Sequence, residues 1–81
     1  IEGGHTMAAN AFILVNSDPT CTEEVIQKLG GISGAVVHEV LGLYDFMVDL
    51  EADTREDITA ILRHKIRPIK GVTNTVTRIC F

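Results

Sequence analysis

The sequence predicts an α+β domain in which a four-stranded antiparallel sheet carries two helices on one face. Its 81 residues suffice for one domain with one core. Short apolar runs of strand type alternate with two stretches of helical periodicity. In addition, 46% of the residues are apolar while only 5% are aromatic, so the core should consist of Ile, Val and Leu. This much apolar surface on a small domain favours burial against a second subunit.

The first strand and the start of the first helix are marked by composition. Residues 11–15 form a continuous apolar run and predict a buried strand. Asp18 followed by Pro19 is typical of a helix start, with Asp18 as the N-cap. Thr20 and Glu23 form a competing capping box, three residues apart. Both alternatives begin a helix in this segment.

The first helix has a short apolar stripe and ends at a glycine pair. The stripe consists of Val25, Ile26 and Leu29. Gly30 and Gly31 predict the C-terminus, because glycine adopts the left-handed conformation at a helix end without steric cost. Residues 35–41 and 44–50 then predict a hairpin with Gly42 and Leu43 as a two-residue connection.

The second half contains one more helix and one more strand. Asp53 or Thr54 caps the helix, because each has an acidic residue three positions later. Its buried stripe consists of Ile58, Ile61, Leu62 and Ile66. The helix should end near Arg67, since Pro68 disfavours helical geometry in the residue before it. Residues 72–81 alternate threonine and apolar side chains and predict the last strand.

The order strand, helix, strand, strand, helix, strand predicts the ferredoxin-like βαββαβ arrangement. Both helices then cover the same face of the sheet. Met47, Val76 and Cys80 share the alternation of Asp45 and Arg78, so both faces of the sheet carry apolar residues. This mixture favours a sheet-to-sheet dimer. We expect Cys80 to behave as a small buried hydrophobe.

Composition also limits the classes of function. The net charge is −4 and the pI is near 5.1, which argues against direct nucleic-acid binding. The one basic cluster is interpreted as a solvated helix end and comprises Arg63, His64, Lys65, Arg67, Lys70 and Arg78. No apolar run approaches the roughly 20 residues of a membrane span. We therefore expect a cytoplasmic protein without a membrane partner.

Asp45 is the main candidate for ligand binding. It lies in an apolar strand just after the turn at Gly42, where an unpaired charge needs a partner. The amide groups of such a turn suit the carboxylate of a small zwitterion, and Asp45 suits its ammonium group. Alternatively, Asp45 is a hairpin aspartate that accepts backbone N–H groups, as aspartate commonly does in turns.

The sequence predicts no catalytic residues, no metal site and no cofactor. Cys21 and Cys80 have no metal-ligand spacing and, like the serines, lack a recognisable histidine partner. His38 and Glu39 are strand neighbours, so their side chains should point to opposite faces. The glycine-rich residues 30–34 follow a helix, which is the wrong context for a phosphate-binding loop.

Two segments carry a resemblance to a known family. Residues 42–46, Gly-Leu-Tyr-Asp-Phe, and residues 70–77, Lys-Gly-Val-Thr-Asn-Thr-Val-Thr, resemble the effector-binding domain of the Lrp/AsnC family. The resemblance extends over about residues 11–81. We therefore interpret residues 8–81 as an Lrp/AsnC-like ligand-binding and oligomerisation domain, and residues 1–7 as an expression-tag remnant.

The resemblance implies how such a domain works. Sheets would pair face to face in a homodimer, and dimers would join into a ring, often an octamer of four dimers. An amino-acid effector would bind in the clefts between dimers and control assembly. Carried over by position, the ligand-binding residues are Gly42, Leu43, Tyr44, Asp45, Thr75, Thr77 and Arg78. Lys70 and Arg78 depart from the family pattern, which commonly has a proline and a neutral residue there.

Regulators of this family carry an N-terminal helix-turn-helix, and the sequence contains none. The chain thus looks like a stand-alone or truncated form, with full-length Lrp/AsnC regulators as possible partners. The alternatives are a ferredoxin-like dimeric enzyme, a pure assembly domain and an ACT-type amino-acid-binding domain. ACT domains place the ligand glycine after the first strand, where residues 16–19 contain no glycine.

Overall fold

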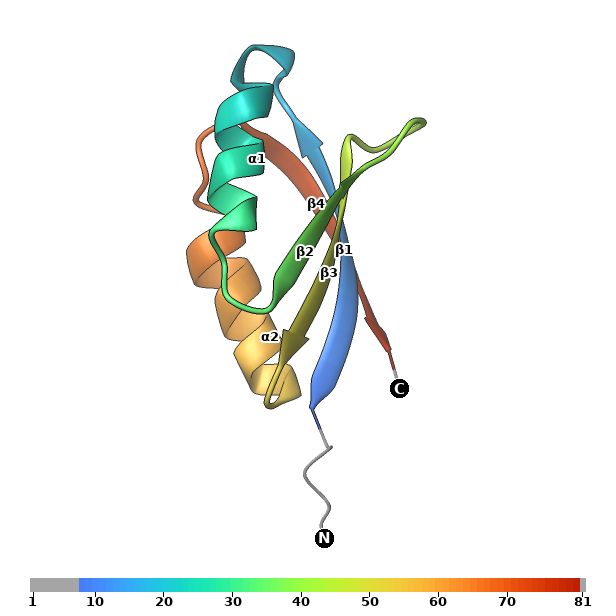
Figure 1. Ribbon diagram of the computed structural model, residues 1–81, viewed down its shortest axis with the longest axis vertical. Coiled ribbons are helices and arrows are strands. Elements are labelled where there is room, and N and C mark those ends of the chain that lie inside the picture. Colours follow the sequence, from blue (N-terminus) through green and yellow to red (C-terminus); the bar gives the residue numbers. More distant parts are fainter. Residues whose placement is uncertain (1–7, 81) are drawn as a thin grey trace, which may run out of the picture.

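The computed structural model describes residues 8–80. The predicted tag remnant at residues 1–7 lies outside them. The described elements are β1 (Ala9–Ser17), α1 (Thr22–Gly30), β2 (Ala35–Glu39), β3 (Phe46–Ala52), α2 (Arg55–Ile61) and β4 (Val72–Cys80). A 3-10 turn at Pro19–Cys21 leads into α1, and a π-helical turn at Leu62–Ile66 extends α2. Figure 1 shows both helices on the same face of the sheet.

The sheet has the order β2-β3-β1-β4, and every neighbouring pair is antiparallel. Ile13 in the centre of β1 is paired with Val48 of β3 and Thr77 of β4. This topology confirms the predicted ferredoxin-like βαββαβ fold. It leaves β2 and β4 as the two edges of the sheet, with β1 and β3 between them.

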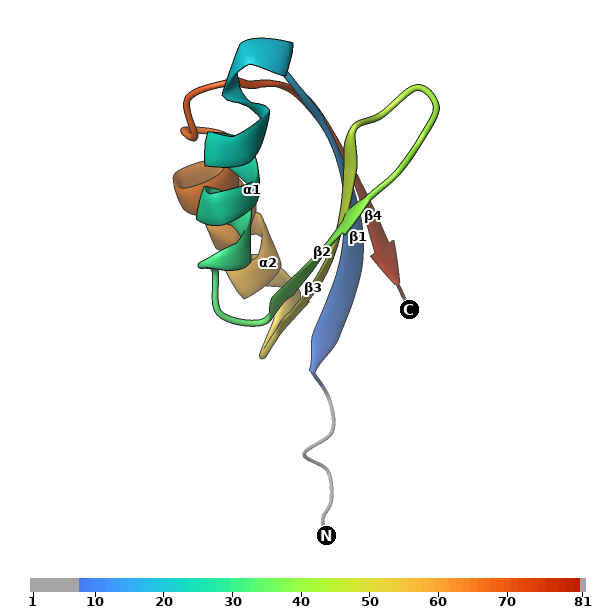
Figure 2. The ribbon, with the colours of Figure 1, turned by 45° about the horizontal axis from the view of Figure 1, so that its top comes forward.

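The core is formed by residues of both helices and of the sheet, two layers that Figure 2 shows lying against each other. Every second side chain in the middle of β1, from Ala11 to Val15, is fully buried, and so are its partners on β3. Among residues 8–80, the cluster of buried residues comprises Ala11, Ile13, Val15, Val25, Leu29, Ile32, Phe46, Val48, Leu50, Ile58, Leu62 and Ile66. Burial of a large aliphatic side chain contributes about 1.5–3 kcal/mol. The predicted aliphatic core is therefore present, with Phe46 as its one aromatic member.

Asp18 caps the helical segment that follows β1, as predicted. Its Oδ1 accepts hydrogen bonds from the Thr20 amide at 2.9 Å and from the Thr20 hydroxyl at 2.8 Å. Thr20 is thus a partner of the cap rather than the start of a capping box. At the other end, Gly31 has a φ of −82°, so the predicted left-handed C-cap is wrong. The chain instead turns at Gly34, where φ is +85°.

The second helix begins at Thr54, one of the two N-cap residues that the sequence predicts. Thr54 Oγ1 accepts a hydrogen bond from the Asp57 amide at 3.0 Å, which assigns the N-cap to Thr54 and not to Asp53. The helical segment ends at Ile66, with Arg67 as its cap. The predicted end before Pro68 is therefore confirmed.

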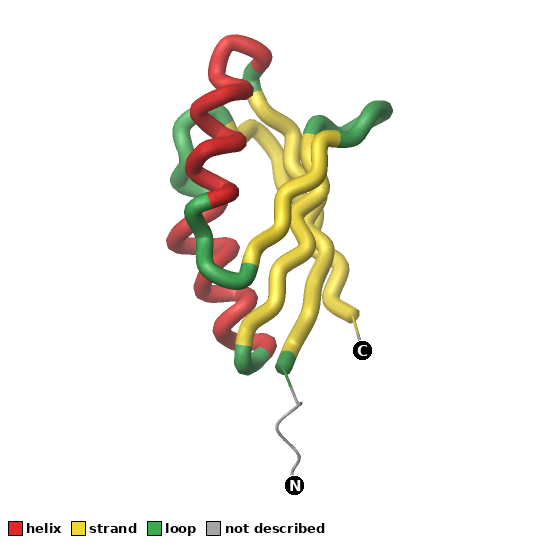
Figure 3. The backbone as a smooth tube through the Cα atoms, in the orientation of Figure 1, coloured by secondary structure: helices red, strands yellow, loops and turns green. Residues whose placement is uncertain are grey.

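The hairpin between β2 and β3 differs from the prediction in its strand ends. Glu39 pairs with Phe46, which is the predicted register, but the connection spans residues 40–45 and not two residues. The Val40 amide still donates to the Asp45 carbonyl at 3.1 Å. Beyond that hydrogen bond the chain leaves the sheet as a projecting loop, drawn in green in Figure 3.

The sheet face opposite the helices is open. Because paired residues of neighbouring strands share a face, the register assigns to it Phe12, Leu14, Met47, Val76, Asp49, Arg78, His38 and Cys80. The first four are only partly exposed and form an apolar centre. The prediction that both faces carry apolar residues is confirmed. Cys80 is exposed, so its predicted burial is wrong in the single subunit: it lies at the end of the edge strand β4.

Candidate functional site

The loop at residues 40–45 presents apolar side chains to solvent. Leu41 is 103% exposed and Leu43 is 89% exposed. Gly42 adopts a φ of +128°, and a Cβ at this position would have no neighbour within 4 Å. The glycine is therefore required by the backbone turn and not by packing within the subunit.

Asp45 is held at the base of this loop by β1. Its Oδ2 accepts a hydrogen bond from the Ser17 amide at 2.8 Å, and its own amide donates to the Val15 carbonyl at 3.0 Å. Of the two roles considered for Asp45, ligand binding and acceptance of backbone N–H groups, the structure shows the second. One carboxylate oxygen is fixed in this way, and the residue as a whole remains exposed.

The loop also carries backbone donors that are free within the subunit. Among residues 8–80, no acceptor pairs with the amide groups of residues 41–44. Consecutive free amides next to an oriented carboxylate offer complementary groups for a zwitterion.

A cavity of about 440 Å³ lies beside Asp45, between the hairpin and the start of α1. Its walls are formed by Thr22, Glu39, Val40, Leu41, Asp45 and Phe46. A smaller recess of about 240 Å³ shares Glu39 and Phe46 with it and adds Ile26 and Val37. Asp45 is therefore the predicted site residue that lines a cavity together with a second carboxylate, that of Glu39.

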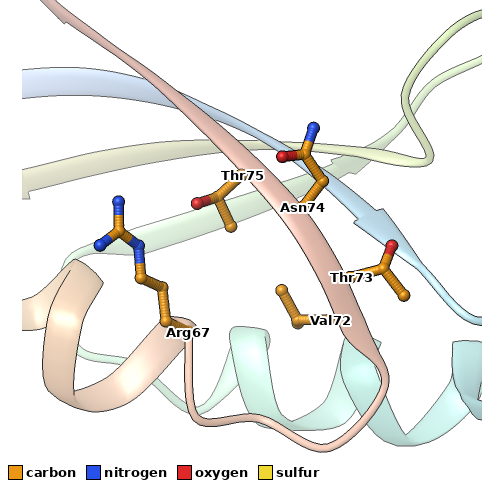
Figure 4. A pocket seen from close by; sticks show the side chains of 5 residues that line it. All are labelled: Arg67, Val72, Thr73, Asn74 and Thr75. Atoms are coloured by element: carbon orange, nitrogen blue, oxygen red, sulfur yellow. The ribbon is translucent and has the colours of Figure 1, made fainter.

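A separate cavity of about 360 Å³ lies at the edge strand β4, lined by Arg67, Val72, Thr73, Asn74 and Thr75. Figure 4 shows the Arg67 guanidinium group and the Thr75 side chain on the same side of β4, with Asn74 pointing away. This cavity combines a cation with hydroxyl groups, which suits an anionic group.

The structure does not bring all predicted ligand residues together within one subunit. Thr75 and Thr77 pair with Val15 and Ile13 and lie on the helix side of the sheet. Arg78 pairs with Phe12 and lies on the open face, because adjacent strand residues alternate. Strand β1 separates this set from the loop that holds Gly42, Leu43, Tyr44 and Asp45.

Sequence reasoning missed two residues that line these cavities. Glu39 was considered only as a possible catalytic partner of His38. The hairpin register could have identified it, because pairing with Phe46 brings Glu39 to the part of the hairpin that contains Asp45. Arg67 was assigned to a solvated helix end. Only the return of the chain from α2 into β4 brings it to Thr75, so no local pattern could have identified it.

Other chemistries find little support in the described part of the chain. Within residues 8–80, no group of three metal-ligating side chains is assembled. His38 pairs with Met47 and Glu39 with Phe46, so the two side chains lie on opposite faces of β2, as predicted. Cys21 and Cys80 are both free cysteines. No described helix combines the length and apolarity that crossing a bilayer requires.

Comparison with known proteins identifies relatives over nearly the whole chain. An uncharacterized HTH-type transcriptional regulator of Pyrococcus furiosus is 34% identical over 79 residues, which cover 93% of this chain and 53% of the regulator. The chain therefore spans about half the length of the curated relatives it matches.

Solved structures agree with this similarity. FFRP-DM1 superimposes with a TM-score of 0.85 and 31% identity, covering 90% of this chain and 99% of that one. A transcriptional regulator of Neisseria meningitidis, solved as a complex with L-Met, has a TM-score of 0.86, covering 100% of this chain and 56% of its own. Its identity is 10%, so this second match shows the shared fold alone.

The family model of the Lrp/AsnC ligand binding domain matches residues 10–81. This range includes the loop with Asp45, both helices and the threonine-rich strand β4. The match agrees with the resemblance carried by residues 42–46 and 70–77. The chain belongs to the family of Lrp/AsnC ligand binding domains, the effector-binding domains of transcriptional regulators.

Proposed function

We propose that this domain senses a small amino acid at a cleft that neighbouring protomers complete, and that ligand binding there controls assembly. The observation that carries the proposal is the environment of Asp45. The Ser17 amide orients its carboxylate at 2.8 Å, beside the cavity of about 440 Å³ and the free amides of residues 41–44. Asp45 would bind the ammonium group of the ligand, and the loop amides its carboxylate.

Assembly is supported by two apolar surfaces. The partly exposed apolar centre of the open sheet face, Phe12, Leu14, Met47 and Val76, suits a second sheet in a homodimer. The exposed side chains of Leu41 and Leu43 suit a further contact between dimers. An octamer built of four dimers would use both surfaces. Residues that lie apart in one subunit, Asp45 and Thr75 among them, could then meet across a subunit boundary.

The mechanism would be linkage between ligand binding and assembly. A ligand that contacts two protomers binds one arrangement more tightly than another, and it shifts the equilibrium by that difference in affinity. The L-Met complex of the Neisseria regulator supports the amino-acid class of ligand. We further propose a cytoplasmic, non-enzymatic role, in which the domain acts on full-length regulators of its family and not on DNA directly.

Thermal melting with each of the twenty amino acids tests sensing. A ligand at 100 times its Kd stabilises the folded state by about 2.7 kcal/mol, so a clear rise in Tm is expected for the effector. Asp45→Asn should abolish the rise. Asp53→Asn, which removes an exposed carboxylate elsewhere, should preserve it. Sensing is refuted if no amino acid at millimolar concentration changes the Tm of the unmodified chain.

Sedimentation tests assembly and separates sensing from a pure assembly domain. Leu14→Lys should yield monomers, because it adds a charge to the centre of the open face. Ala60→Lys, on the exposed surface of α2, should leave the wild-type assembly intact. The alternative, a pure assembly domain, is supported by the exposed leucines alone. If it is correct, sedimentation should give the same distribution of oligomers with and without amino acids.

A further inference from the structure

The cavity beside Asp45 carries more negative charge than a neutral amino acid can pair. Two of its lining residues, Glu39 and Asp45, are acidic, and none is basic. Within residues 8–80, neither carboxylate forms an ion pair. Glu39 is the last residue of β2 and Asp45 directly precedes β3, and both residues line this one cavity.

Most of the other residues that line the cavity are apolar. Val40, Leu41 and Phe46 line the same cavity. Ile26 and Val37 line the smaller recess of about 240 Å³ that shares Glu39 and Phe46 with it. Glu39 therefore lines both the cavity that contains Asp45 and the smaller apolar recess. A ligand that fits this arrangement has two cationic groups joined by a hydrocarbon stem.

We infer that the effector is an amino acid with a cationic side chain, such as lysine, ornithine or arginine, and that Glu39 determines this specificity. The inference rests on the proposed function, since it requires Asp45 to bind the α-ammonium group. The side-chain cation then pairs with Glu39, and the methylene stem lies against Val40 and Phe46.

The physical reason is the cost of an unpaired carboxylate in a closing cleft. When a second protomer covers the cavity, Glu39 loses water, and a buried charge without a partner is strongly unfavourable. A neutral side chain leaves that charge unpaired, and an acidic one adds repulsion. A basic side chain provides a charge-assisted hydrogen bond, so it is selected over an uncharged side chain of equal length.

Titration calorimetry on the full chain with L-lysine, L-norleucine and L-glutamate tests the inference. Norleucine has the length of lysine but no side-chain charge. Lysine should bind about tenfold or more tightly than norleucine, which corresponds to one hydrogen bond to a charged group. Glutamate should bind weakest. Glu39→Gln should remove the preference for lysine by weakening lysine binding and tightening norleucine binding, because no charge is then left unpaired.

Two matched variants make the outcome decisive. Glu23→Gln, which removes an exposed carboxylate of α1 outside the cavity, should retain the preference for lysine. Asp45→Asn should weaken lysine and norleucine alike. Equal binding of lysine and norleucine, or a preference that survives in Glu39→Gln, overturns the specificity while sensing at Asp45 stands. If none of the three amino acids binds and no other raises the Tm, both proposals fail together.

Discussion

Replacing Gly34 by alanine tests the backbone that joins α1 to the hairpin. Gly34 has a φ of +85°, and a Cβ there would collide with the main-chain carbonyl oxygen of Glu51. The Glu51 amide in turn donates to the Gly34 carbonyl at 2.9 Å, so the two segments cannot separate without breaking this hydrogen bond. The left-handed conformation costs alanine about 1–2 kcal/mol. Loss of the hydrogen bond adds about 0.5–1.5 kcal/mol.

Gly30→Ala is the matched control, because the same atoms are added at a site with open space. Gly30 is the last residue of α1, and a Cβ there would have no neighbour within 4 Å. This substitution should stabilise the domain by about 0.4–1 kcal/mol, since it lowers the entropy of the unfolded chain. The two variants should therefore change the stability in opposite directions.

Thermal unfolding followed by circular dichroism measures both effects at one fixed protein concentration, because the stability of an oligomer depends on concentration. A destabilisation of roughly 2–3 kcal/mol corresponds to a Tm lower by roughly 10–20 °C in a domain of this size. Gly30→Ala should melt a few degrees above the wild type. A Gly34→Ala variant that melts with the wild type would refute the proposed contact with the Glu51 carbonyl.

Three further predictions concern capping and burial. Thr54→Ala removes the acceptor of the Asp57 amide and should destabilise the domain by about 1 kcal/mol in urea unfolding, with Thr54→Ser restoring most of the loss. The pKa of Asp18 is lowered by the hydrogen bond from the Thr20 amide and then by that from its hydroxyl. The stabilisation from this cap is therefore present above the pKa of aspartate in the unfolded chain, near 4, and is lost as the pH falls through the lower pKa of the folded state. The difference in Tm between the wild type and Asp18→Asn should shrink from pH 6 to pH 2. A difference that stays constant over this range would contradict the cap. Among residues 8–80, the buried Ser17 hydroxyl has no hydrogen-bond partner, so Ser17→Ala should leave stability unchanged or raise it by about 1 kcal/mol, and a large loss would reveal a partner.

The elements follow from local rules that a sequence displays directly. Asp18 before Pro19 and Thr54 before an acidic residue mark helix starts, because a side-chain oxygen can accept a nearby free amide. Pro68 marks a helix end through a steric effect on its neighbour. The register that pairs Glu39 with Phe46 also follows from the position of Gly42. All of these interactions join residues a few positions apart.

The misassigned features depend on distant parts of the chain. The predicted strand 35–41 ends earlier, at Glu39, and the predicted strand 44–50 begins later, at Phe46, because the loop leaves the sheet after the hydrogen bond between Val40 and Asp45. The helix end at Gly31 is right-handed, and the change of direction occurs at Gly34, where the chain packs on the Glu51 carbonyl. Propensity identifies glycine as permissive, but packing decides which glycine takes the unusual conformation.

The sequence by itself determined the order of elements, the face that each helix buries and the loop motif that identifies the family, because periodicity, caps and motifs are local. Only the tertiary structure decided what surrounds Asp45. Its partner Ser17 lies 28 residues away along the chain, and Thr22 of α1 completes the cavity wall. The order β2-β3-β1-β4 also separates Asp45 from Thr75. Strand order arises from burial of the whole core at once, which no short segment encodes.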